Sequence, residues 1–187
     1  GRSHGTTAAA KAGDHPAPTG TKIYYSTSEN GPWSEESPEI KDIGTKIVYV
    51  KAENPNFETA RASATLKVTP KEVTVTADDK SKKYGEKDPE LTASVKGTLD
   101  GDTVKYQLSR ESGNDVGKYT ITPSGKEDQG NYTVKYAAGK LEITKSDNLK
   151  VTAKGYTGTY DGTSHGASAV AKVGDNPAPA GTTIYYK

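Results

Sequence analysis

The chain has 187 residues, 31% of them hydrophobic and 26% charged, with 12 Tyr, one Phe, one Trp and a net charge of +1. Short apolar runs recur regularly, which excludes a disordered polyelectrolyte, and the lack of a basic cluster argues against a nucleic-acid partner. Cysteine is absent, which excludes disulfides and thiolate metal sites, and no apolar run approaches the roughly 18 residues that span a membrane. This supply of apolar residues suits several thin β layers better than one thick core.

Short segments in which apolar and polar residues alternate follow one another along the chain, and this alternation predicts β-strands. In chain order they are KIYYS, KIVYV, ATLKV, EVTVTA, LTASV, VKYQL, KYTIT, NYTVKY, KLEIT and NLKVTA. In EVTVTA, for example, Val73, Val75 and Ala77 share one face. Clusters of Gly, Pro, Asn and Asp separate the segments, and no segment has a convincing helical pattern. The sequence therefore predicts an all-β protein of tandem Ig-like β-sandwich modules.

A repeat organises the chain. Residues 1–26 align without gaps on residues 162–187, and 17 of the 26 aligned positions are identical. A different unit lies between the two copies, so we expect modules in the order A–B–A. The expected parts are 1–69, an Ig-like module A lacking its first strand; 70–145, an Ig-like module B; and 146–187, the N-terminal part of a second module A. The joins are short and lack a Gly/Ser linker, which predicts an elongated array.

The two incomplete modules complement each other. The segment NLKVTAKGYTGTYDG of the second module A corresponds to the strand that the first one lacks. For this segment by itself we therefore expect head-to-tail strand exchange, in which the tail of one molecule completes the head of the next and forms filaments or rings. In an intact array the same chain would supply the strand, so the exchange would have no bearing on natural function. Within module B, the terminal strands 73–77 and 140–144 are expected to pair and to bear force.

Residues Gly162 to Gly166 read G-x-S-x-G, the pattern of a hydrolase nucleophile elbow. An elbow needs a helix after the serine, but the residues that follow Ser164 carry neither a helix cap nor an amphipathic stripe. The pattern also recurs around Ser3, and turns are repeated along an array more readily than active sites. We expect a turn in which Gly162 and Gly166 supply unusual backbone angles, no nucleophile at Ser3 or Ser164, and no enzyme.

No metal or cofactor site is expected. The chain has three histidines, His4, His15 and His165, and His15 is replaced by Asn176 in the other repeat copy. The acidic stretches 77–80 and 99–103 lack the spaced loop and terminal Glu of a calcium site. The aromatic residues that could stack on a sugar are Trp33, with Tyr25 and Tyr186 as further candidates.

A structural motif occupies the second half of module B. Asp115-x-Gly117-x-Tyr119 has the spacing of a tyrosine corner, in which the ring packs inward and the hydroxyl holds a loop. We therefore expect Tyr119 to be largely buried. Module A has a looser counterpart in which Asp42 and Gly44 are followed by lysine at the tyrosine position.

Module B resembles the MBG domain of YGX type, an Ig-like repeat found in tandem in large extracellular bacterial proteins. The matching stretches are KKYGEKDPELTASVKGTLDGDTV, GNDVGKYTITPSG and NYTVKYAAGKLEITK, which cover nearly all of 70–145. Modules A resemble YDG-motif repeats of Gram-positive surface proteins, through GYTGTYDGTSHG, DIGTKIVYVKAENPNF and ATLKVTP. The resemblance implies secretion, a cell-surface location and a stalk or adhesin context, and it supplies no catalytic residue.

These observations together predict a non-catalytic stalk of a bacterial adhesin, with neighbouring modules of the same chain as its partners and no membrane insertion in this segment. The alternative is an adhesive module that binds host glycans or mucin.

Overall fold

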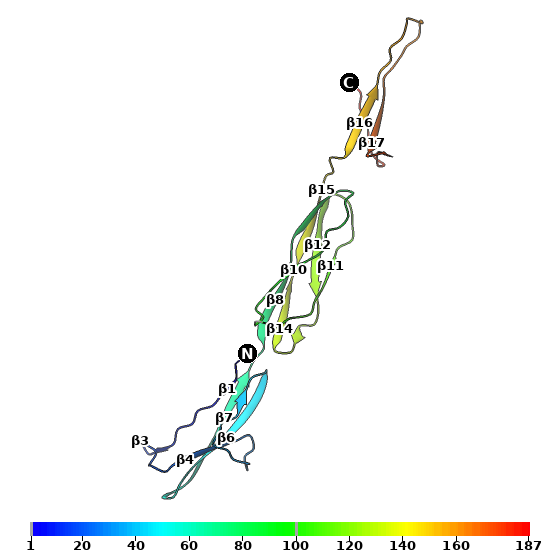
Figure 1. The fold of residues 1–187 in the computed structure, drawn as a ribbon. Helices are drawn as coiled ribbons and strands as arrows, with labels where there is room; N and C mark the ends of the chain where they lie inside the picture. The colour runs from blue at the N-terminus through cyan, green and yellow to red at the C-terminus, as the bar shows by residue number, and fades with distance from the viewer. Residues whose placement is uncertain (1, 100) are drawn as a thin grey trace.

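The computed structural model describes residues 2–99 and 101–187, and every regular element in these ranges is a β-strand. The strands form several small sheets that follow one another along one line (Figure 1). The all-β prediction is confirmed. Among the described residues no helix is long and apolar enough to cross a membrane.

Module A is built around a three-stranded antiparallel sheet in the order β4-β6-β7. Its strands are β1 (His4–Gly5), β2 (Lys11–Ala12), β3 (His15–Pro16), β4 (Lys22–Ser26), β5 (Glu39–Ile40), β6 (Gly44–Asn54) and β7 (Phe57–Val68). The long β6–β7 hairpin carries a register shift between Ala52 and Asn54. Among its described hydrophobic residues Val48 alone is fully buried, so one apolar face of this sheet has little cover.

Module B consists of two four-stranded sheets, ordered β10-β8-β14-β13 and β11-β12-β15-β9. Its strands are β8 (Lys71–Ala77), β9 (Lys80–Lys83), β10 (Ala93–Lys96), β11 (Gln107–Arg110), β12 (Gly117–Ser124), β13 (Asp128–Gln129), β14 (Tyr132–Ala137) and β15 (Gly139–Thr144). Strand β12 of one sheet packs against β8 and β14 of the other, which makes a β-sandwich.

The core of module B has two clusters of buried side chains. The first contains Val73, Val75, Tyr132 and Val134, and the second contains Ala77, Ile121, Leu141 and Ile143. The predicted common face of Val73, Val75 and Ala77 is confirmed, since all three are buried. Strand β8 therefore contributes to both clusters and ties the two sheets together.

The predicted pairing of segments 73–77 and 140–144 with each other is wrong. The chain changes sheets at Asp78 and Asp79, so β8 pairs in parallel with β14, while β9 pairs in parallel with β15. Asp79 accepts a hydrogen bond from Lys140 N at 2.9 Å, and this contact holds the crossing point against the last strand. Each of the two N-terminal strands of module B is thus bonded to one of its two C-terminal strands.

The second module A contains β16 (Leu149–Lys154), β17 (Ser168–Val173) and β18 (Asn176–Pro177), in that order in one antiparallel sheet. Its pairs Lys172–Pro177 and Val173–Asn176 repeat the pairs Lys11–Pro16 and Ala12–His15 of the first copy. The repeat seen in the sequence is therefore also a repeat of backbone pairing. The segment IYYK at 184–187 is not a strand, because no neighbouring strand lies beside it in the described residues.

Side-chain contacts tie the modules to one another at both joins. Asn131 of module B donates from Nδ2 to Asp42 Oδ1 at 2.8 Å and accepts from Ile43 N at 2.9 Å. At the other join Lys83 Nζ lies 3.0 Å from Asp147 Oδ2. The looser corner motif of module A thus faces its neighbour, with Asp42 engaged by Asn131.

Candidate functional sites

A network of charged side chains centred on Asp88 closes one end of module B. Asp88 accepts hydrogen bonds from Lys82 Nζ at 2.7 Å and from Arg110 Nε at 2.7 Å. The Lys82 side chain is only 6% exposed, and its ammonium also donates to Glu86 O at 3.0 Å. Burying an ammonium is unfavourable unless it is paired and hydrogen-bonded, so Asp88 and the 84–88 loop are what keep Lys82 in place.

Arg110 extends this network to a second loop. Its Nη1 atom donates to the backbone oxygens of Glu111 and Gly113 at 2.7 and 2.6 Å, and its Nη2 atom donates to Asn114 Oδ1 at 3.2 Å. The guanidinium also lies over the ring of Tyr119, 5.7 Å from its centre. One arginine therefore fixes the loop after β11 to the loop after β9.

Tyr119 has the hydroxyl contact of the predicted corner. Its Oη atom donates to Asp115 O at 2.9 Å, and its ring packs against the Ile121–Leu141 cluster. Gly113 lies against the ring so closely that a Cβ atom there would clash with it, which explains glycine at this position. Tyr119 is partly buried, with its ring packed inward against this cluster.

We expect Tyr119→Phe to lower the free energy of unfolding of module B by about 1 kcal/mol, because the substitution removes one hydrogen bond and keeps the ring. Thermal denaturation followed by circular dichroism measures the change. Tyr160→Phe is the matched control, since Tyr160 is 94% exposed and removing its hydroxyl should leave the stability unchanged. Equal melting temperatures for both variants would show that the Asp115 contact contributes nothing.

The electrostatics of the Asp88 network favour its charged form. The hydrogen bond from Lys82, followed by that from Arg110, holds the pKa of the Asp88 carboxyl below its usual range. The network lines a polar depression of about 450 Å³ together with Tyr84 and Asn114. Because these charges are already paired with one another, the arrangement is suited to holding loops rather than to acid–base chemistry.

The acidic stretches are engaged by neighbouring polar groups. Asp78 accepts from the hydroxyls of Thr92 and Ser94, and Asp102 accepts from the hydroxyl of Tyr132. Asp100 lies outside the described residues. Across the part of the chain that the structure describes, no three His, Cys, Asp or Glu side chains gather as metal ligands.

The G-x-S-x-G segment lies in the loop 155–167 between β16 and β17. His165 Nε2 is 2.9 Å from Asp161 Oδ1 and its ring stacks on Tyr156, so its contacts are with these residues rather than with Ser164. Gly162 has the expected positive φ of 76°, whereas Gly166 does not, which corrects that half of the prediction. The chain continues into strand β17, not into the helix that an elbow requires. Ser3, in the other copy, precedes β1 and is exposed, and Gly1 lies outside the described residues.

Of the three candidate sugar-binding aromatics, Trp33 directly precedes Ser34, the bridge partner of Tyr25, whereas Tyr186 lies in the second module A. Trp33 is half-buried, and two cations, Lys51 and Arg61, lie over its ring at 5.0 and 5.3 Å from its centre. Tyr25 is held within β4 and pairs with Ser34, whereas Tyr186 is exposed in the second module A.

Sequence reasoning missed the cationic partners of these rings. Tyr24, Lys51 and Arg61 stand opposite one another across β4, β6 and β7, and Lys51 Nζ also lies 5.0 Å from the Tyr24 ring centre. Alternation along each strand was visible in the sequence, but the register that aligns the three strands was not.

The geometry of module B agrees with a family comparison. Residues 73–142 match the MBG domain (YGX type), and neither a curated protein nor a solved structure matched the chain. The match covers the first buried cluster, the second except for Ile143, the Asp88 network and the tyrosine corner. The domain is typical of bacterial surface proteins and is a non-catalytic surface module. The YDG-repeat resemblance of the flanking modules stays a prediction. Residues 73–142 of this chain are an MBG domain of the YGX type.

Proposed function

We propose that this chain is a load-bearing, non-catalytic stalk segment of a bacterial cell-surface protein, outside the cell, where it holds a distal domain away from the envelope. The MBG domain supports the surface location, since it is typical of such proteins. The observation that carries the mechanical role is the strand pairing at the two ends of module B.

Two parallel strand pairs resist extension of module B. Force would enter at the start of β8 and leave at the end of β15, and these strands pair in parallel with β14 and β9. When two parallel partners are pulled from opposite ends, the force acts along the strands. All hydrogen bonds between them then share the load, instead of breaking one after another. The first of these contacts is Lys71 N to Asn131 O at 2.9 Å, and the last is Tyr84 N to Thr144 O at 2.8 Å.

The joins support the same role. Asn131 accepts the Lys71 bond on its backbone oxygen while its side chain binds Asp42 and Ile43 of module A. Bending at this join would break bonds to both neighbours, so the array should stay extended. We expect X-ray scattering to show an elongated particle.

Single-molecule pulling tests the proposal. We expect module B to unfold in one step that releases roughly 240–270 Å of extended chain, less its folded length. Lys71→Pro should lower the unfolding force, because proline removes the N–H that begins the parallel ladder. Glu111→Pro is the matched control: it removes the bond from Glu111 N to Thr120 O, in the β11–β12 hairpin and away from the terminal pairs. Equal forces for both variants would refute the mechanical role.

Glycan or mucin binding is the competing function, and the exposed rings of Tyr185 and Tyr186 are the feature that favours it. A glycan array probed with the whole chain separates the two. Specific binding that is lost in Tyr185→Ala would make the segment an adhesive module.

A further inference from the structure

Module A has a bend whose counterpart in module B is held by a tyrosine. Residues 42–43 form a bend directly before β6, and residues 115–116 form a bend directly before β12. In module B the hydroxyl of Tyr119 donates to a backbone oxygen of the bend at 2.9 Å. In module A the residue at that position is Lys46, and its ammonium donates to Glu39 O at 2.5 Å instead. Module A therefore lacks the side chain that would tie this bend to its own strand.

A side chain of the neighbouring module holds the module A bend. Asn131 of module B donates from Nδ2 to Asp42 Oδ1 at 2.8 Å, and its Oδ1 atom accepts from Ile43 N at 2.9 Å. Within the described residues no other side chain forms a hydrogen bond with either residue of the bend. The atoms differ from those of the tyrosine corner, but the element that is held is the same: the bend that leads into a long strand.

The chemistry of this contact specifies an amide on a fixed backbone. An amide side chain both donates and accepts, so one asparagine serves a carboxylate and the adjacent N–H together. The backbone of Asn131 is fixed on both sides, because its carbonyl accepts from Lys71 N at 2.9 Å and the next residue, Tyr132, is buried. Asn131 itself is exposed. Its side chain therefore serves the join and has no part in the core of module B.

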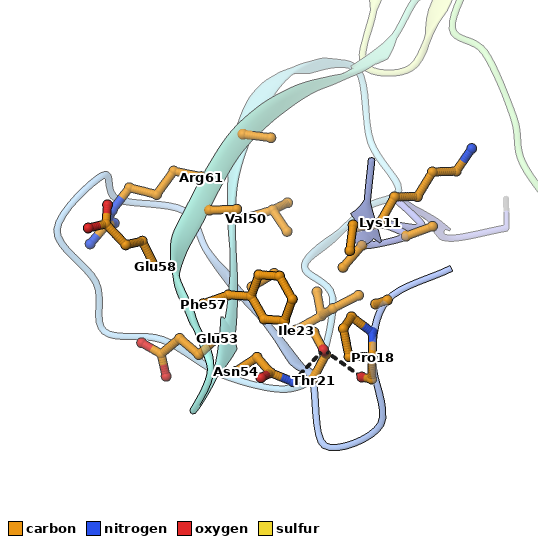
Figure 2. A pocket seen from close by; sticks show the side chains of 18 of the residues that line it. Lys11, Pro18, Thr21, Ile23, Val50, Glu53, Asn54, Phe57, Glu58 and Arg61 are labelled. Atoms are coloured by element: carbon orange, nitrogen blue, oxygen red, sulfur yellow. Dashed lines mark hydrogen bonds between the residues drawn. The ribbon is translucent and has the colours of Figure 1, made fainter. Parts of the chain in front are cut away.

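The bend is separate from the groove that opens on the β4-β6-β7 sheet of module A (Figure 2). The groove has a volume of about 470 Å³, and Figure 2 shows Ile23, Val50 and Phe57 pointing into it. The described residues that line it come from the N-terminal segment, from β4 and from the part of the β6–β7 hairpin near its turn, and none of them belongs to 41–46. The contact with module B is therefore independent of whatever fills the groove.

We propose that Asn131 is a docking residue that recognises the Asp42–Ile43 bend and completes, from the neighbouring module, the corner that module A lacks. The partner that this surface fits is a module whose Asp-x-Gly bend is not held by a tyrosine of its own. The order of the loop between β5 and β6 then depends on module B. The inference concerns how neighbouring modules recognise each other, and it stands whether or not the array bears load.

One substitution opposes the contact and a second one restores it. Asn131→Asp removes the donor, places a carboxylate against that of Asp42 and leaves every backbone bond of module B in place. Asp42→Asn combined with Asn131→Asp exchanges the two roles: the amide then lies in module A and donates to the carboxylate in module B, which still accepts from Ile43 N. Asn148→Asp is the matched control, because Asn148 is exposed at the other join and its side chain, unlike its backbone N–H, has no hydrogen bond in the described part of the chain.

Hydrogen exchange at the Ile43 amide, followed by NMR on the whole chain, measures the result. We expect Asn131→Asp to speed this exchange by about tenfold, while the exchanged pair and Asn148→Asp behave as the unaltered chain does. The amide of Val134, which is buried in module B and donates to Glu127 O, should stay protected in every variant. Unchanged exchange at Ile43, no recovery in the exchanged pair, or lost protection at Val134 would each overturn the proposal, the last because the side chain would then serve module B itself.

Discussion

Replacing Ile121 by alanine should lower the free energy of unfolding of the MBG domain by roughly 2–5 kcal/mol. The Ile121 side chain is fully buried among Ala77, Leu141 and Ile143, so the shorter side chain would leave a cavity in the core. A domain of this size has a small core and a total stability of about 5–15 kcal/mol, so the loss is a large share of it.

Chemical denaturation measures this loss. Val116→Ala is the matched control, because Val116 is half-exposed. This substitution removes a similar amount of side chain, but from a position outside the core. It should change the stability by less than about 0.5 kcal/mol. If the domain tolerated Ile121→Ala as well as it tolerates Val116→Ala, the second buried cluster could not be a cooperative part of its core.

The faces of the strands could be predicted from the sequence, and their partners could not. Alternation in EVTVTA placed Val73, Val75 and Ala77 inside, because side chains on a strand point to opposite faces in turn. It contained no information on the change of sheet at Asp78 and Asp79, which splits the N-terminal strand of the domain between two sheets. Pairing between segments far apart in the chain depends on the whole sandwich, so the expected pairing of 73–77 with 140–144 failed.

Contacts between residues that are close in the sequence could be predicted, whereas contacts between residues far apart in the sequence could not. The spacing of Asp115, Gly117 and Tyr119 led to the hydroxyl contact because the loop spans only five residues. The burial of Lys82 could not be predicted in this way, because the stretch KSKK has the composition of a solvent-exposed charged segment. Its burial follows from Asp88 and Arg110, and Arg110 comes from a strand that only the fold places beside it.

Asp88→Asn should lower the melting temperature of the MBG domain by several degrees, because it leaves the buried Lys82 ammonium without its counter-charge. Asp147→Asn is the matched control: its partner Lys83 is about half exposed, and pairs in that setting add little to stability. The double substitution Lys82→Met with Asp88→Asn should regain much of the loss, since it removes the stranded charge and keeps the apolar stem. Equal melting temperatures for the two Asn variants, or no recovery in the double variant, would show that the buried charge is not the cause.

The same substitution should change how the domain responds to acid. The hydrogen bonds from Lys82 and Arg110 lower the pKa of Asp88 in the folded domain. Its contribution to stability is therefore present above the ordinary carboxyl pKa of about 4 and is lost as the pH falls through the lowered value. Asp88→Asn removes this proton uptake, so the melting temperature of the variant should fall less steeply than that of the unaltered domain below about pH 4. The two curves should converge in acid, because a protonated Asp88 and an asparagine leave Lys82 in the same position, with a neutral partner in place of a carboxylate. Curves that stay parallel down to the acid limit would mean that the network contributes through loop packing and not through charge.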